Sequence, residues 1–351
     1  MADVTIDATA RGGTNTALGN GAGFGTVWTA AGTGYIFYID SDDDFKYTKT
    51  TDSGATWAAA VTISGAAEIQ KFCVWFDKWT PSDTGVIVHT TYYNAPTDTV
   101  FYRQLNTSTD VLGTQRTVVT EGASAGAGDW STAQVGVVKA IGGNIYVAYH
   151  INGGGTQHAF YRSTDGGVTF GSRTDVWLDT AADQIHLMPG AETNNQDIYA
   201  LLLDRSTDDL LFRTYADTGN TWTATGTIDA SVVDNVGTRM FSCAVRHSDK
   251  FILVALWSEI NTATADLRTY AVTTPAASFA ATAKTDVLTN TTNSGGTDIF
   301  INQNNDDVYV CYGTGTWATA IGINYKLSTD DMTTWGTATN FSDTDTNTVQ
   351  D

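Results

Sequence analysis

The chain has 351 residues, of which 42% are hydrophobic and 16% are charged, a composition that supports a folded core and excludes a disordered chain. Its 38 Asp and Glu against 18 Lys and Arg give a formal net charge of −20, which disfavours nucleic acid and anionic membranes as partners. The longest apolar run, Phe251 to Trp257, is too short to cross a bilayer, and the N-terminus shows no signal-peptide pattern, so we expect no membrane insertion.

Six runs of β-branched and aromatic residues follow one another along the chain, and each is typical of a strand. A turn rich in Gly, Asn, Asp or Pro introduces each run and predicts a hairpin. The runs are Tyr35 to Ile39, Val86 to Thr90, Ile145 to Tyr149, Ile198 to Leu202, Phe251 to Ala255 and Val308 to Tyr312.

A second motif follows each run. Its full form is Tyr47-Thr-Lys-Thr-Thr-Asp52-Ser-Gly54-Ala-Thr56-Trp57, and it returns around Asp165 and Asp217 and, without its glycine, around Asp330. Two weaker copies complete the series. The first residues of the six copies, which we call the anchors, lie at positions 47, 102, 161, 212, 267 and 325, so the intervals are 55, 59, 51, 55 and 58 residues. Such regular spacing indicates an internal repeat.

The two elements together give four short antiparallel strands per repeat. Six repeats of this kind predict an all-β, six-bladed β-propeller over residues 21–351, because radial repetition leaves only short, protected sheet edges. A solenoid is the structural alternative, but its repeats are usually shorter. Residues 1–20 precede the first blade, and we expect them to close the ring or to dock outside it.

The motif around the aspartates resembles the Asp-box, or BNR repeat, of the sialidase superfamily, with the pattern Ser/Thr-x-Asp-x-Gly-x-Thr-Trp/Phe. The Asp side chain caps amides of its own turn, Gly supplies a positive φ, and the aromatic ring packs into a seam. The resemblance implies that each box joins the third and fourth strands of a blade, on the face opposite an active centre. It implies a structural role for Asp52, Asp165, Asp217 and Asp330.

Sialidase chemistry does not follow from this resemblance. Sialidases hold the substrate carboxylate with three arginines, the first in an Arg-Ile-Pro-type motif, and none of the four prolines of this chain follows Arg-Ile. Several arginines stand instead beside an anchor on the third strand, where stacking or pairing is expected rather than catalysis. They are Arg103, Arg162, Arg213 and Arg268.

A ligand site is expected where the loops between second and third strands meet the entries to the first strands. Aromatic rings interleaved with carboxylates suit a sugar, whose apolar faces stack while its hydroxyls form hydrogen bonds. The alternatives are that the tryptophans seal blade seams and that the carboxylates are solvated. The ligand-binding candidates are Trp130, Trp257, Trp317, Arg205 and Arg239, and the catalytic candidates are Glu121, Asp129 and Glu259.

Metal and thiol chemistry have weaker signals. Asp40, Asp42 and Asp44 alternate as in a calcium loop, but the EF-hand glycine and glutamate are absent, so calcium stands as a possible ligand and no other cofactor is expected. Three cysteines lie inside apolar strand-like runs, and we expect buried free thiols. They are Cys73, Cys243 and Cys311.

Two functions are compatible with these features. The first is a non-catalytic propeller that is a structural or glycan-binding part of a virion, such as a phage tail or head surface, or of a similar assembly on an extracellular surface. Its partners are then glycans or other assembly proteins. The second is a glycoside hydrolase of sialidase-like architecture. The missing arginine motif and the Thr/Gly/Asp-rich strands favour the first.

Overall fold

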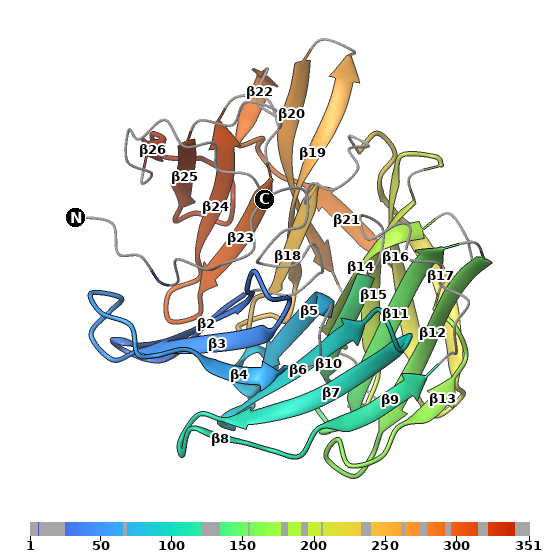
Figure 1. The fold of residues 1–351 in the computed structure, drawn as a ribbon. Helices are drawn as coiled ribbons and strands as arrows, with labels where there is room; N and C mark the ends of the chain where they lie inside the picture. Colours follow the sequence, from blue (N-terminus) through green and yellow to red (C-terminus); the bar gives the residue numbers. More distant parts are fainter. Residues whose placement is uncertain are drawn as a thin grey trace. The chain divides into compact units, whose positions relative to one another are not determined.

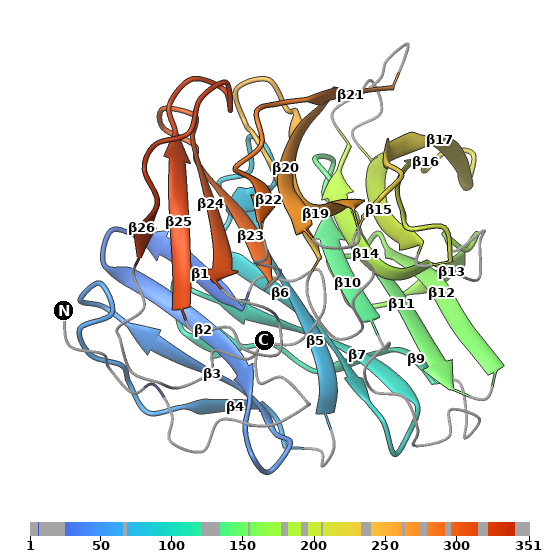
Figure 2. The same cartoon turned by 90° about the horizontal axis from the view of Figure 1, so that it is seen from above.

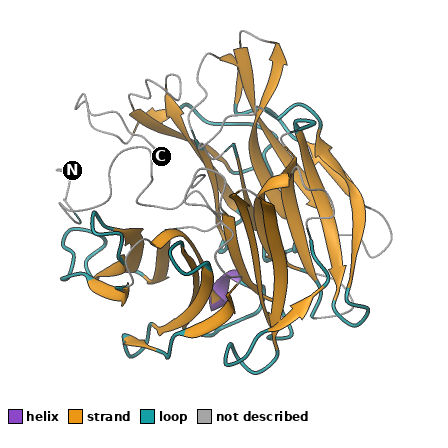
Figure 3. Cartoon of the chain, turned by 45° about the vertical axis from the view of Figure 1, so that its right-hand side comes forward, coloured by secondary structure: helices purple, strands orange, loops and turns teal. Residues whose placement is uncertain are grey.

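The computed structural model describes residues 6, 25–65, 69–120, 134–153, 155–176, 182–190, 196–204, 206–232, 240–261, 264–273, 279–291, 296–314 and 322–340. They group into two compact units, residues 1–187 and 188–351. Strands dominate the described chain, with one 3-10 turn, η1 (Asp77–Trp79) (Figure 3). Within these ranges, no helix has the length and apolar character needed to span a membrane. The predicted N-terminal segment, residues 1–20, lies outside the described residues apart from Ile6.

The strands form six antiparallel sheets, and in each sheet four strands pair in the order of the sequence. Two sheets carry an additional outer strand, since β9 also pairs with β7 and β22 also pairs with β20. Each sheet is one blade, so the predicted fold, an all-β six-bladed propeller with four-stranded blades, is confirmed.

Blades 1 to 3 belong to the first unit, and within each blade the first four strands lie side by side in chain order (Figure 1). Their bounds are β1 (Thr26–Ala30), β2 (Thr33–Ile39), β3 (Phe45–Thr50), β4 (Val61–Ser64), β5 (Ile69–Phe76), β6 (Ile87–Asn94), β7 (Thr99–Asn106), β8 (Val111–Leu112), β9 (Arg116–Thr120), β10 (Gln134–Lys139), β11 (Ile145–Gly153), β12 (Gly155–Ser163) and β13 (Gly171–Arg173).

Blades 4 to 6 follow, and the boundary between the units falls within the first strand of blade 4. Figure 2 shows β23 to β25 side by side in blade 6. The bounds are β14 (Ala182–Pro189), β15 (Ile198–Asp204), β16 (Asp209–Ala216), β17 (Thr221–Asp229), β18 (Phe241–Val245), β19 (Ile252–Asn261), β20 (Thr264–Thr273), β21 (Ala280–Ala283), β22 (Leu288–Thr291), β23 (Thr297–Asn302), β24 (Asp307–Thr314), β25 (Gly322–Ser328) and β26 (Thr339–Asn340).

The predicted repeat maps onto the blades in register. The six strand-like runs coincide with the second strands β2, β6, β11, β15, β19 and β24, and the six anchors all lie in third strands, β3, β7, β12, β16, β20 and β25. The second strand of blade 4, β15, is buried along its whole length, and its run of apolar residues from Ile198 to Leu203 fits a strand buried on both faces.

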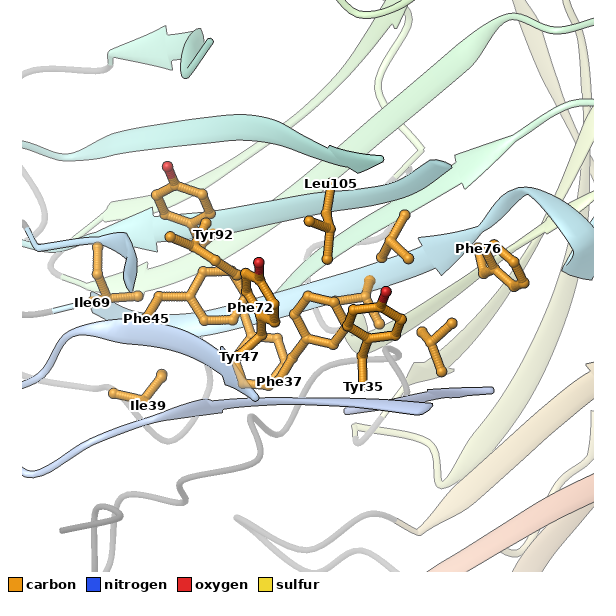
Figure 4. Packing of buried hydrophobic residues seen from close by; sticks show 14 residues of the cluster. Tyr35, Phe37, Ile39, Phe45, Tyr47, Ile69, Phe72, Phe76, Tyr92 and Leu105 are labelled. Carbon is orange, nitrogen blue, oxygen red and sulfur yellow. The ribbon is translucent and has the colours of Figure 1, made fainter. Parts of the chain in front are cut away.

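Aromatic side chains fill the seam between blades 1 and 2. The ring of Phe45 stacks on that of Phe72, with centroids 4.6 Å apart, and lies 5.3 Å from the ring of Tyr92. Figure 4 shows these rings between the strands of the two blades, with Tyr35 and Phe37 continuing the layer. Offset and tilted ring pairs of this kind stabilise the fold by more than the burial of their apolar area alone.

A buried polar network joins blades 2 and 3. The Asp77 carboxylate lies 2.9 Å from His89 Nε2 and 2.7 Å from Lys139 Nζ, and His89 Nδ1 lies 2.6 Å from the Tyr102 hydroxyl. Burial by itself raises the pKa of Asp77, but the bonds from His89 and Lys139 outweigh it and lower that pKa to about 2. Burial also lowers the pKa of His89, so this ring is neutral near pH 7.

The cation that follows an anchor ties one blade to the outer part of the preceding blade. Arg103 donates to the Ile63 carbonyl in β4, Arg268 Nη1 lies 3.2 Å from the Asp229 carboxylate in β17, and Lys326 Nζ donates to the Val287 carbonyl at 2.6 Å. These contacts are pairing contacts at blade seams, as the sequence predicts for Arg103 and Arg268.

Candidate functional site

Three Asp-box turns share one hydrogen-bond pattern. In the first, Asp52 accepts from the Thr56 amide at 2.8 Å and the Thr56 hydroxyl at 2.6 Å, while the Thr50 hydroxyl accepts from the Gly54 amide at 2.9 Å. Asp165 and Asp330 make the equivalent bonds with Thr169 and Thr334. The Thr56 hydroxyl is the main cause of the lowered pKa of Asp52, about 2. These carboxylates are committed to their own turns.

Two successive residues after each of these aspartates have a left-handed backbone. Ser53 and Gly54 have φ of 62° and 89°, Gly166 and Gly167 have 72° and 87°, and Asp331 and Met332 have 58° and 59°. The fourth copy therefore keeps the turn although its glycine is lost, and Met332 is fully buried there. The burial of this side chain offsets part of the cost of its backbone conformation.

The copy around Asp217 folds differently from the expected box. Its strands continue to Ala216 and resume at Thr221, which pair directly, so that Asp217 to Asn220 form a four-residue turn. The Asp217 amide donates to the Asp197 carboxylate at 2.9 Å. The physical reason is visible in the sequence: the position two before the aspartate holds Tyr215, whereas the other three copies have a Ser or Thr there whose hydroxyl accepts from the amide four positions later.

The two glycines of the blade 3 box allow a matched test. A Cβ on Gly167 would press into the Tyr102 ring, whereas a Cβ on Gly166 would meet nothing within 4 Å, and both residues have positive φ. We expect Gly166→Ala to lower the free energy of unfolding by about 1 kcal/mol through backbone strain alone. Gly167→Ala adds the steric clash and should cost about 3 kcal/mol or more. Chemical denaturation measures both, and equal losses would contradict the packing of Tyr102 on this turn.

Most of the predicted site residues lie outside the described residues. They are Glu121, Asp129, Trp130, Arg205, Arg239 and Trp317. Glu259 lies in β19, but its side chain is not described. Trp257 lies two positions earlier in β19 and is 0% exposed, so its ring is a core residue and is not available to stack on a sugar. The structure thus favours the seam-sealing alternative for Trp257.

Asp40 serves its own loop. Its carboxylate accepts from the amides of Asp42 and Asp44 at 3.0 and 2.9 Å and pairs with Lys46, while its side chain is 1% exposed. Burial and then the nearby Asp40 raise the pKa of Asp44. No group of three potential metal ligands occurs among the described residues. Calcium at this loop stays a prediction.

The entries to the first strands contain two buried polar atoms. Gln70 in β5 and Gln134 at the start of β10 are 6% and 2% exposed, and the side-chain oxygen of each lacks a hydrogen-bond partner within the described part of the chain. They lie at the end of the blades where the sequence predicts a ligand. The residues that precede these two strands, 66–68 and 121–133, are outside the described residues.

A cleft of about 250 Å³ opens at the β12–β13 edge of blade 3. Arg162 pairs with Gly171 across these strands and Phe160 pairs with Arg173, so the two arginines are diagonal neighbours on one face. A Cβ on Gly171 would meet no atom within 4 Å, which places open space directly beside Arg162. The six lining residues include two cations and three hydroxyls but no carboxylate: Arg162, Thr164, Thr169, Gly171, Ser172 and Arg173.

The Asp-box shapes this cleft. The Thr169 hydroxyl donates to Asp165 at 2.6 Å, so its oxygen keeps lone pairs for a ligand hydroxyl. The sequence prediction noted Arg162 only as a third-strand cation and missed Arg173 and Gly171. The available signal was the segment Gly171-Ser-Arg173, where a cation follows an Asp-box directly in a short outer strand.

The fold and cleft define a β-propeller with an arginine-lined depression on one blade. No protein-family model and no curated protein matches the sequence. Among solved structures, AofleA from Arthrobotrys oligospora is similar with a TM-score of 0.54, 12% identity and coverage of 89% of this chain and 83% of that chain.

Two other solved structures show the same fold. The Hadza microbial sialidase Hz136 has a TM-score of 0.53 at 13% identity; the match covers 82% of this chain and 62% of the sialidase, less than two thirds of its length. A PL25 ulvan lyase has a TM-score of 0.52 at 11% identity, covering 89% of this chain and 81% of that chain. At these identities the similarity describes the six-bladed propeller alone.

Proposed function

We propose that this chain is an Asp-box propeller that binds carbohydrate without cleaving it. The blade 3 cleft carries this proposal. Its guanidinium and hydroxyl groups suit the hydroxyls of a sugar, and its volume of about 250 Å³ fits one sugar residue better than a larger ligand. Hydrolysis of a glycosidic bond generally needs two carboxyl groups about 5–10 Å apart, and none lines the cleft.

The distant similarities support a carbohydrate-related role. The similar structures include a fungal lectin, a sialidase and a polysaccharide lyase, which handle saccharides on the same fold. We describe the chain as an Asp-box propeller because the turns of Asp52, Asp165 and Asp330 share one pattern of hydrogen bonds.

Binding at one cleft should be weak, because its lining offers hydrogen bonds but no aromatic ring for stacking. Display of many copies would raise the avidity by about 10²–10⁴. We therefore propose that many copies of the chain are displayed together, as in a virion or another repetitive surface assembly. The proposal of such an assembly rests on the composition of the sequence.

A glycan array probed with multivalent protein tests the proposal. Wild type should bind a subset of glycans, and Gly171→Val should lose that binding, because a β-branched side chain fits an outer strand and fills the space beside Arg162. Gly171→Ala fills less and serves as the matched control. Mass spectrometry should recover the bound glycans intact. Binding unaffected by Gly171→Val, or cleavage that depends on Glu121, Asp129 or Glu259, would overturn the proposal.

A further inference from the structure

The two arginines of the cleft differ in one respect: the blade repeat explains Arg162 but does not explain Arg173. Arg162 follows an anchor, and its counterparts Arg103, Arg268 and Lys326 bind the preceding blade, so the fold itself explains a cation at this position. Arg173 pairs with the residue before the anchor. At this register position, the other outer strands whose pairing is described hold only uncharged residues: Thr62, Thr117, Thr227 and Asn340. The repeat therefore does not explain Arg173.

The lining of the cleft holds two cations and no carboxylate, in a chain of net charge −20. Diagonal neighbours across antiparallel strands lie about 7–8 Å apart, within reach of two long side chains that converge on one group. Gly171 leaves the space beside them open. The nearby Asp165 accepts from Ser163, Val168 and twice from Thr169, so its oxygens are bound by donors of its own turn.

We propose that the saccharide bound at this cleft is anionic and that its carboxylate or sulfate lies between Arg162 and Arg173. This inference rests on the proposed function and specifies the ligand class. Guanidinium groups bind planar or tetrahedral oxyanions through paired N–H donors, which gives geometric selectivity as well as charge. Thr164 and Thr169 then take the sugar hydroxyls.

Calorimetric titration of matched ligand pairs tests the proposal. One pair is a galacturonic acid disaccharide and its methyl ester, and the other is a sulfated galactose disaccharide and its desulfated form. We expect the charged member of one pair to bind wild type about 10- to 100-fold more tightly than the neutral member, and Arg173→Gln to abolish that difference. Lys78→Gln removes one exposed positive charge from the same unit and should leave the difference unchanged.

The outcomes separate the two proposals. Preference for the uronate or for the sulfate identifies which oxyanion is recognised, and partial recovery in Arg173→Lys would show that charge alone supplies part of the affinity. Equal binding of charged and neutral members, with loss in Gly171→Val, would overturn the anionic ligand and leave saccharide binding intact. Charge preference that survives Arg173→Gln also overturns the inference. An absence of binding for all four ligands, with a silent array, contradicts both.

Discussion

Asp77→Ala should lower the free energy of unfolding of the first unit by about 3–5 kcal/mol, the cost of removing one partner from a buried ion pair. Asp77 is 2% exposed, and its carboxylate accepts from His89, Lys139 and the Ile87 amide. Removal of the carboxylate takes the acceptor from the buried His89 ring and from the Ile87 amide, and it takes from Lys139 one of its two carboxylate partners. Denaturant unfolding followed by intrinsic fluorescence measures the loss.

Asp83→Ala is the matched control for this effect. Asp83 pairs with the same Lys139 nitrogen at 2.7 Å, but its side chain is 20% exposed, ten times the exposed fraction of Asp77. A half-buried ion pair contributes less than a fully buried one, and Asp83 also accepts from the Gly85 amide, so this change should cost about 1–2 kcal/mol. If Asp77→Ala costs no more than Asp83→Ala, the network does not stabilise the seam between blades 2 and 3.

Arg268→Met should lower the free energy of unfolding of the second unit by about 2–4 kcal/mol, somewhat below the value for a fully buried pair because Arg268 is 25% exposed. Its guanidinium is the cation between Asp229, at 3.2 Å, and Asp266, at 3.8 Å. Tyr270 also donates to Asp229 at 2.7 Å, and burial, followed by that bond, raises the pKa of Tyr270 to about 12. Without Arg268, the carboxylates repel one another.

The loss should depend on pH in a defined direction. Burial, then Asp266, raises the pKa of Asp286, and Arg268 opposes that shift. A carboxyl group with a raised pKa in the folded state stabilises the fold at low pH and loses that stability as pH rises through its folded pKa. The Arg268→Met loss should therefore be smaller at about pH 5 than at about pH 7.

Lys326→Met is the control at the same repeat position. Its ammonium donates to a neutral carbonyl of Val287, so its removal should cost about 1 kcal/mol with little change between these pH values. A pH-independent loss in Arg268→Met would show that the carboxylates around Arg268 do not repel one another.

The blades could be predicted from sequence because their signals are local. Each turn is specified by residues within a few positions, as the Thr50, Asp52 and Thr56 contacts show, and a middle strand such as β15 is apolar from Ile198 to Leu203. For the Asp217 turn and for Trp257, the sequence also contains residues that indicate the observed structure. Tyr215 replaces the box hydroxyl before Asp217, and Trp257 ends a continuous apolar run that is typical of a buried strand.

The cleft could not be predicted in the same way. Arg162 and Arg173 are eleven positions apart, and they share one face only because the Asp-box turn sets the pairing of Arg162 with Gly171 and of Phe160 with Arg173. A change of one residue in that register would move Arg173 to the opposite face. The site depends on the cross-strand register, which the spacing of residue types alone does not determine.

The most direct test of saccharide binding at blade 3 is a crystal structure of the full chain with the best ligand from the array. We predict density for an intact saccharide over Gly171, with an oxyanion between Arg162 and Arg173. Density instead at the first-strand entries near Gln70 and Gln134, or density for a cleaved product, would contradict this account.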